Sequence, residues 1–251
     1  KLEEWIPYYV DAQEENGYFD TYFILGANGN TPKWWDFNLH ELYCAGHFYE
    51  AAVAHYRATN GQDTRLFDMA IKNADYVCSL FGEGKWKQVP GHQEIELALV
   101  KLANLCNEIG GEYAEKAQNY ITLAEFFLDT RGDYEGRHGT NHNNQYDQDH
   151  LPVAEQREAV GHAVRAGYMY TAMADINLLE QDGRYDEALL ALWDDIENKK
   201  TYVTGGIGSN PSNEGYGNAY DLPNDTAYCE TCANIANVMF NQRMNLLFGD
   251  S

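Results

Sequence analysis

The sequence is poor in basic residues, cysteine and proline, and each shortage excludes a class of protein. Only 17 Lys and Arg stand against 39 Asp and Glu, so the formal net charge is −22. This charge repels phosphate backbones and anionic lipid, and neither nucleic acid nor a membrane is the expected partner. Five cysteines are an odd number for a disulfide framework and fit a reducing compartment or a metal site better. Six prolines and no long biased run argue against disorder.

Long apolar runs are also missing, since no stretch approaches the length of a transmembrane helix. The chain of 251 residues is 44% apolar, which is enough for one large domain or two small ones. Its 19 Tyr and five Trp permit stacking on sugar rings, although most aromatic residues simply fill cores. It starts at Lys1 without Met or a leader pattern, so we expect a processed or excised end. A bacterial cytoplasm or periplasm are both compatible locations.

Apolar residues recur at helical spacing along nearly the whole chain, and no alternating run demands a sheet. An all-α fold is therefore predicted. The final helix is expected to begin with Asp225 as its N-cap. The predicted helices cover residues 1–14, 38–59, 65–81, 92–108, 112–128, 152–180, 184–198 and 225 onward.

Three stretches repeat one design, in which a glycine and a short polar start precede a helix with small and apolar residues along one side. They begin near Gly61, Gly110 and Gly183. Each follows a longer, more apolar helix after a tight turn, which predicts three helix-turn-helix units. Such units bury their apolar faces only against neighbours, so the pattern indicates a stack or a closed ring of helical hairpins.

Reactive side chains gather at the N-terminal ends of the longer helices. In a ring of parallel inner helices these ends converge on one mouth, which predicts a polar pocket for a small molecule. A single histidine in a helix is more often structural, but several at convergent helix starts favour a site. The residues at these starts are His40, His92 with Gln93 and Glu94, Gln156 with His162, and Glu230 with Cys232.

The cysteines allow more than one interpretation. Cys229 and Cys232 form a Cys-x-x-Cys pair at a helix start, where a redox pair is possible, but the expected strand before it is absent. A structural zinc site needs a second pair, and the sequence has none. His40, Cys44 and His47 share one helix face and could bind a metal, but we expect Cys44 to pack in the core.

Six stretches together resemble glycoside hydrolase family 127, the β-L-arabinofuranosidases, from about Gly17 to the end. The resemblance implies the family's (α/α)6-barrel catalytic domain, which agrees with a ring of hairpins. The stretches are HELYCAGH (40–47), VPGHQEIELALVKL (89–102), PVAEQREAVGHAVRAGYMYTAMAD (152–175), YVTGGIGS (202–209), Glu214, and YDLPNDTAYCETCA (220–233).

What the resemblance implies is a retaining glycosidase that cleaves β-L-arabinofuranosidic linkages with a zinc-bound cysteine as nucleophile. Glu214 matches the general acid/base, and Glu230 and Cys232 match two ligands of Zn²⁺. Cys229 matches no ligand. Retaining hydrolysis usually uses two carboxyl groups, and zinc lets a thiolate replace one of them at neutral pH. Three histidines match residues that hold the sugar hydroxyls: His40, His92 and His162.

One departure from the family is a missing cysteine pair. The family's nucleophile and a neighbouring ligand are adjacent cysteines downstream of the Glu-Thr-Cys motif, and no Cys-Cys follows here. Eight predicted helices are also fewer than the twelve of a closed ring. We therefore expect residues 1–251 to be part of one catalytic domain, an incomplete ring, with flanking helices and β-rich domains outside this chain. Alone, it is expected to bind zinc weakly and to be inactive.

Two other functions fit the same scaffold. An unsaturated glucuronyl hydrolase or a sugar epimerase would need no zinc, so metal analysis of the intact protein separates them from the arabinofuranosidase. A non-catalytic helical-repeat module would use the polar helix starts as a binding surface. The oligomeric state and the exact sugar are left open by the sequence.

Overall fold

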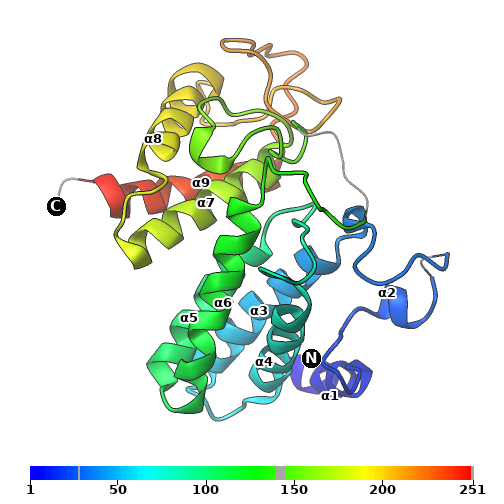
Figure 1. Ribbon diagram of the computed structural model, residues 1–251. Helices are drawn as coiled ribbons and strands as arrows, with labels where there is room; N and C mark the ends of the chain where they lie inside the picture. The colour runs from blue at the N-terminus through cyan, green and yellow to red at the C-terminus, as the bar shows by residue number, and fades with distance from the viewer. Residues whose placement is uncertain (28, 140–144, 250–251) are drawn as a thin grey trace. The chain divides into compact units, whose positions relative to one another are not determined.

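The computed structural model describes residues 1–27, 29–139 and 145–249 of the chain (Figure 1). Over these residues the chain consists of helices and loops, and its β-structure is limited to isolated bridges. The predicted all-α class and the absence of a sheet are confirmed for this part of the chain. Two compact units are present: unit 1 comprises Lys1–Phe127 and Gly136–Thr140, and unit 2 comprises Leu128–Glu135 and Asn141–Ser251.

Unit 1 is built around two helical hairpins. Helix α3 packs against both α4 and α5, and α1 packs against α4. The colour gradient in Figure 1 shows α3 and α5 running in the same direction, with α4 and α6 returning. The helices of this unit are α1 (Leu2–Ala12), α2 (Thr21–Ile24), α3 (Glu41–Ala58), α4 (Arg65–Leu80), α5 (Ile95–Ile109) and most of α6 (Glu112–Asp129).

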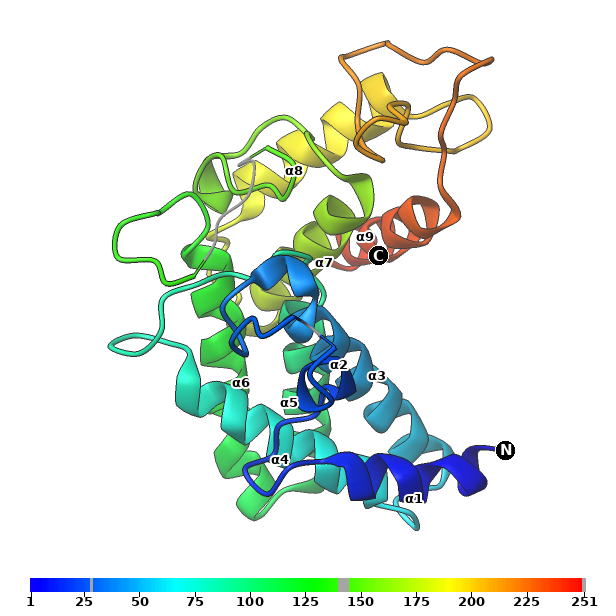
Figure 2. The same ribbon diagram turned by 90° about the vertical axis from the view of Figure 1, so that its right-hand side faces the viewer.

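Unit 2 is centred on α7 (Ala163–Glu180), whose first fifteen residues are all buried. Helix α9 (Thr231–Phe248) lies beside it, as both views show (Figures 1 and 2). The two helices approach closely at Gly167, where a Cβ atom would lie 2.6 Å from the Cβ of Ala236. The remaining elements are a 3-10 turn (Val153–Glu155) and α8 (Asp186–Asp195), which continues into a π-helical turn (Ile196–Lys200).

The three predicted helix-turn-helix units are confirmed as α3–α4, α5–α6 and α7–α8. Glycine is required in the first turn, because Gly61 has φ +71° and its amide donates to the carbonyl of Tyr56 at 2.8 Å. This is the left-handed conformation in which an L side chain is strained and glycine is not. The turn between α3 and α4 therefore depends on its glycine, as the sequence indicated.

The predicted helix over 152–180 is wrong in its first third. Apart from the short 3-10 turn, the chain before His162 is not helical, and α7 begins only at Ala163. Gly161 has φ +72°, and a Cβ atom there would lie 1.9 Å from the carbonyl oxygen of Gln145. The amide of His162 donates instead to the carbonyl of Tyr146 at 2.9 Å. Pairing with a distant loop thus overrides the helical pattern, and Gln156 is not at a helix start.

Helix starts were generally predicted too early. Asp225 does not cap the last helix, because α9 begins at Thr231 with Glu230 in the N-cap position. Helix α3 likewise begins at Glu41, since His40 has φ +66° and separates it from a 3-10 turn (Phe37–Leu39). The short helix α2 was not predicted, and Asp20 caps it by accepting from the amide of Tyr22 at 2.9 Å.

All five cysteines are free thiols, which agrees with the expectation that the chain has no disulfide framework. Cys44 is exposed rather than packed in the core, so that prediction is wrong. Helix α3 buries Ala45 and Tyr49 instead. Among the described helices, none combines the length and apolar character needed to cross a bilayer.

Candidate active site

The densest group of predicted site residues lies in unit 2, around a contact between His162 and Glu214. The Nε2 atom of His162 lies 3.1 Å from Oε2 of Glu214. The His162 side chain is 7% exposed and that of Glu214 is 49% exposed, so the carboxylate faces solvent from a buried base. A carboxyl that contacts a buried imidazole and is itself exposed to solvent is accessible to a ligand.

Backbone hydrogen bonds fix this contact on both sides. The amide of Ala163 donates to the carbonyl of Glu214 at 3.1 Å, and the amide of Tyr216 donates to the carbonyl of Gly161 at 3.0 Å. These bonds form an isolated antiparallel bridge that joins His162 to Gly215. Two segments more than 50 residues apart in sequence are therefore held in register where the imidazole meets the carboxylate.

Two predicted site residues have backbone conformations that non-glycine residues rarely adopt. Glu214 has φ +53° and His40 has φ +66°. Such positions cost of order 1–3 kcal/mol each, and they concentrate at functional sites where the surrounding structure enforces them. Both side chains therefore extend from a backbone conformation that the surrounding structure must stabilise.

Glu230 and Cys232 lie beside the His162–Glu214 pair at the start of α9. One ligand atom from each of His162, Glu214 and Glu230 lies within 4.8 Å of the others, a spacing that could accommodate a metal ion. The Cys232 thiol forms a hydrogen bond with the Glu230 carboxyl, and this bond is the main reason that the pKa of Cys232 is raised. Oε2 of Glu230 is buried and has no hydrogen-bond partner among the described residues.

Cys229 has a different environment from Cys232. Its amide donates to the carbonyl of Gly208 at 2.9 Å, and its sulfur packs against Gly206, where a Cβ atom would lie only 3.1 Å away. Its backbone is in the left-handed region, with φ +42°. The two thiols of the Cys-x-x-Cys pair do not form a disulfide, and they lie in different environments.

Three residues of this site were missed by the sequence analysis. Tyr228 hydrogen-bonds to Glu214 through its hydroxyl. Tyr146 places its ring edge against His162, and the Arg165 guanidinium lies over the face of Tyr146. Tyr146 falls in a long polar loop whose contact with His162 depends on tertiary pairing, so no local pattern could have indicated it. Arg165 and Tyr228 lie within the stretches 152–175 and 220–233, and this position is the sequence signal that could have indicated them.

The other two predicted histidines belong to unit 1. The rings of His40 and His92 lie 6.0 Å apart between centroids, and Tyr43 contacts both, at 5.7 Å and 4.3 Å respectively. His92 Nδ1 lies 2.7 Å from the carbonyl oxygen of Gln93. Unit 1 thus brings together two of the six predicted residues and unit 2 brings together four. A single mouth shared by all six stays a prediction.

A buried carboxyl of unit 1 lies near a further histidine, His47. Glu94, at the N-cap of α5, has a side chain that is 2% exposed, and its Oε1 lies 3.5 Å from Nδ1 of His47. Burial raises its pKa well above the ordinary value. The absence of a side chain at Gly46 makes room for it, because a Cβ atom there would lie 1.7 Å from Glu94 Oε2.

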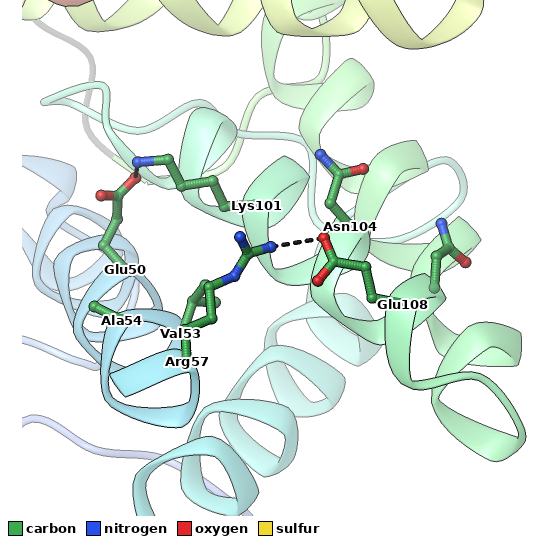
Figure 3. Close-up of a pocket in the computed structure, with 8 residues that line it drawn as sticks. Glu50, Val53, Ala54, Arg57, Lys101, Asn104 and Glu108 are labelled. Carbon is green, nitrogen blue, oxygen red and sulfur yellow. Dashed lines mark hydrogen bonds and ion pairs between the residues drawn. The ribbon is translucent and has the colours of Figure 1, made fainter. Parts of the chain in front are cut away.

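One groove of unit 1 is separate from these residues. It has a volume of about 610 Å³ and lies between α3 and α5 in unit 1 (Figure 3). Its two cations are already neutralised, since Lys101 pairs with Glu50 at 2.5 Å and Arg57 pairs with Glu108 at 2.7 Å. The groove contains none of the six predicted site residues and offers no unpaired charge to an ionic ligand.

Comparison with known proteins identifies the family. The model of the glycoside hydrolase family 127 catalytic domain, described as beta-L-arabinofuranosidase, matches residues 1–251. The chain belongs to this family. The match to family 127 thus extends over the whole given sequence and includes the residues before Gly17.

Individual relatives agree with this assignment. The chain is 37% identical, over 93% of its length, to the non-reducing end beta-L-arabinofuranosidase of Bifidobacterium longum subsp. longum. It superimposes with a TM-score of 0.88 and 44% identity on a solved GH127 beta-arabinofuranosidase, and with a TM-score of 0.85 and 41% identity on a GH127 beta-L-arabinofuranosidase from Geobacillus stearothermophilus T6. Both superpositions cover 99% of the chain.

These family 127 relatives are longer proteins. The chain spans 37% of the curated relative and 38% and 40% of the two solved structures. The solved relatives have (α/α)6-barrel-like folds, so the predicted fold class, helical hairpins of an (α/α)6 barrel, is confirmed.

Proposed function

We propose that the protein carrying this chain is a retaining glycoside hydrolase that cleaves β-L-arabinofuranosidic linkages. Its place in family 127 and its similarity to relatives named as arabinofuranosidases support this function. The observation that carries the proposal is the His162–Glu214 contact, with Glu230 beside it. A neutral sugar is also a substrate class that the net charge of −22 does not repel.

Glu214 is proposed as the general acid/base. Its side chain is half exposed, so a glycosidic oxygen can reach it, while His162 contacts it from the buried side. In the first step its carboxyl donates a proton to the leaving oxygen as the bond to the anomeric carbon breaks. In the second step the carboxylate takes a proton from the water that releases the sugar. A cysteine thiolate from outside these 251 residues is the proposed nucleophile.

Glu230 and Cys232 are the residues of this chain that would hold a zinc ion. A carboxylate and a thiol are both ordinary zinc ligands, and Oε2 of Glu230 is buried without a hydrogen-bond partner in the described part of the chain. A buried carboxylate oxygen of this kind suits a cation, because burial without a partner costs free energy. When bound, zinc keeps a coordinating thiol deprotonated at neutral pH.

His40 and His92 are proposed to bind the sugar hydroxyls, and the same role for His162 stays a prediction, because its two ring nitrogens already contact the Arg165 amide and Glu214. His92 Nδ1 faces the Gln93 carbonyl, so it carries the ring hydrogen and leaves Nε2 as an acceptor. The tilted arrangement of His40, Tyr43 and His92 presents both polar and aromatic edges to a ligand. A furanose ring, with hydroxyls on a compact ring, matches this mixture of groups.

The role of Glu214 is tested with Glu214→Gln in the intact protein and two β-L-arabinofuranosides that differ in leaving group. Loss of a general acid costs roughly 10²–10⁴-fold in rate when the leaving group needs a proton. We expect a loss in this range with a methyl glycoside and a much smaller one with a dinitrophenyl glycoside in a single-turnover experiment. Glu83→Gln, at an exposed position in unit 1, is the matched control.

Equal rates for Glu214→Gln and the wild-type protein on the methyl glycoside would remove Glu214 from the acid/base role. The stereochemistry is tested separately by proton NMR of the first sugar released. Retention predicts the β-anomer of arabinofuranose as first product, before mutarotation. Release of the α-anomer would contradict the retaining mechanism.

A further inference from the structure

The hydrogen bonds around His162 define which ring nitrogen carries its proton. Nδ1 is the N-cap acceptor of α7 and receives a hydrogen bond from the amide of Arg165 at 3.3 Å. An accepting nitrogen has no hydrogen, so in the neutral ring the hydrogen is on Nε2. Nε2 therefore donates to Oε2 of Glu214, 3.1 Å away. A ring flip would replace both interactions, leaving the helix uncapped and turning a different ring edge toward the carboxylate.

Tyr146 contacts the same imidazole from the side. Its ring centroid lies 5.5 Å from that of His162, with an interplanar angle of 82°, which is the edge-to-face geometry that aromatic rings prefer. The carbonyl of Tyr146 also accepts from the amide of His162 at 2.9 Å. The ring of Tyr146 thus restrains the imidazole of His162, and the carbonyl of Tyr146 restrains the backbone of His162.

Arg165 holds Tyr146 in turn. Its guanidinium lies 4.6 Å from the centroid of the Tyr146 ring, a cation–π distance, and the residue is only 5% exposed. A buried arginine needs compensating charge, and Asp147, which is fully buried, supplies it. Arg131, also fully buried, donates to the carbonyl of Asp147 at 2.8 Å.

We propose that Tyr146 and Arg165 are positioning residues that hold His162 in the orientation in which its Nε2–H donates to Glu214. The inference rests on the proposed role of Glu214 for its catalytic meaning. The orientation itself is a property of this chain's own residues. A buried charge cluster is weak evidence for stability, because desolvation offsets the attraction between the charges. A role in fixing one orientation of a neighbouring ring accounts for its location behind the His162–Glu214 contact.

The first test measures the His162 tautomer in the intact protein by long-range ¹H–¹⁵N NMR with ¹⁵N-labelled histidine. The His162 signals are assigned by their loss in His162→Gln. We expect the Nε2–H form alone in the wild-type protein and in Tyr146→Phe, which keeps the ring edge. In Tyr146→Leu, which removes it, we expect averaged nitrogen shifts that report exchange between tautomers. Identical shifts in Tyr146→Leu and the wild-type protein would overturn the proposal.

The second test separates positioning from general destabilisation by steady-state kinetics. Small displacements of a catalytic group can cost about 10²-fold in rate. For Arg165→Met we expect kcat to fall roughly 10- to 100-fold with KM changed by less than about threefold, and Arg165→Lys to restore part of it, since an ammonium also lies favourably over an aromatic ring. The matched control is Arg243→Met, which removes a less deeply buried arginine of unit 2 that is paired with Asp175 at 2.9 Å.

Equal losses in Arg165→Met and Arg243→Met would contradict the proposal, because both would then reflect lost stability. Failure of the proposed function gives a different result. If the wild-type protein does not hydrolyse any β-L-arabinofuranoside, the kinetic test cannot be run, and the tautomer measurement alone decides whether Tyr146 orients His162. If Arg165→Met does not fold, the tautomer measurement on Tyr146→Phe and Tyr146→Leu still tests whether Tyr146 orients His162.

Discussion

The hydroxyl of Tyr18 donates to Oε1 of Glu41 at 2.5 Å, and both residues are buried. The other carboxyl oxygen accepts from the amide of Trp34 at 2.6 Å. Glu41 is the first residue of α3 and directly follows His40, so this contact anchors the helix start that carries a predicted sugar-binding histidine.

This contact predicts that stability depends on pH. Burial raises the pKa of Glu41 to about 7, above its ordinary value of 4.5. A carboxyl with a raised folded-state pKa contributes stability that is complete below pH 4.5 and is lost as the pH rises through 7. We expect the free energy of unfolding to fall by about 3 kcal/mol from this group between those limits. Urea unfolding at a series of pH values measures it.

The control for this prediction is Glu41→Gln. Because an amide cannot titrate, we expect the variant to lose this part of the pH dependence. At low pH we expect its stability to lie within about 1 kcal/mol of the wild-type value, since the protonated carboxyl and the amide each offer one acceptor oxygen and one donor. If the pH profiles of Glu41→Gln and the wild-type protein are parallel, Glu41 is not the group responsible.

The close packing of α3 on the start of α5 gives a second prediction. Replacing glycine by alanine inside a helix normally stabilises it by about 1 kcal/mol. In Gly46→Ala the new Cβ atom would lie 1.7 Å from Glu94 Oε2 and 2.7 Å from the Cα of Ile95, so we expect destabilisation by about 1–3 kcal/mol instead. Combining it with Glu94→Ala relieves only the first clash and restores part of the stability. Denaturant unfolding that finds Gly46→Ala more stable would contradict this packing.

The fold was largely predictable from the sequence because its elements depend on local patterns. Helical spacing and glycine turns identify α3–α4, α5–α6 and α7–α8 as hairpins. The errors lie where distant segments meet. The segment before α7 has a helical pattern, but the amide of His162 pairs with the carbonyl of Tyr146 instead. The start of α9 is displaced from Asp225 to Thr231 by a loop in which the amide of Cys229 donates to Gly208.

The proximity of four candidate site residues was predictable from the sequence, whereas the residues that support them were not. His162, Glu214, Glu230 and Cys232 could be named from motifs, and the structure places them together in unit 2. The residues behind them act through contacts between segments that no spacing rule connects. The positive φ of Glu214 could not be predicted either, because the residues next to it in the sequence do not require a left-handed backbone.

The difference between the two thiols of the Cys-x-x-Cys pair is testable by metal analysis of the intact protein. Loss of an outer hydrogen-bonding partner of a ligand already costs 10- to 100-fold in metal affinity, so loss of a ligand is expected to cost more than roughly 100-fold. We expect this for Cys232→Ser in a competition with a zinc chelator. For Cys229→Ser, the matched control, we expect wild-type affinity, since its sulfur packs on Gly206. Equal losses in both variants would mean that Cys229 is also a ligand.

The backbone of His40 provides a final prediction, which separates strain from binding. With φ +66°, His40 is in a conformation that glycine adopts without strain and alanine does not. We expect His40→Gly to be more stable than His40→Ala by about 1 kcal/mol, because both lose the imidazole and only glycine relieves the backbone. Their KM values for an arabinofuranoside are expected to rise equally, since the lost sugar contact is the same. Equal stabilities with unequal KM values would show that the backbone at this position is unstrained and that the imidazole is not what binds the sugar.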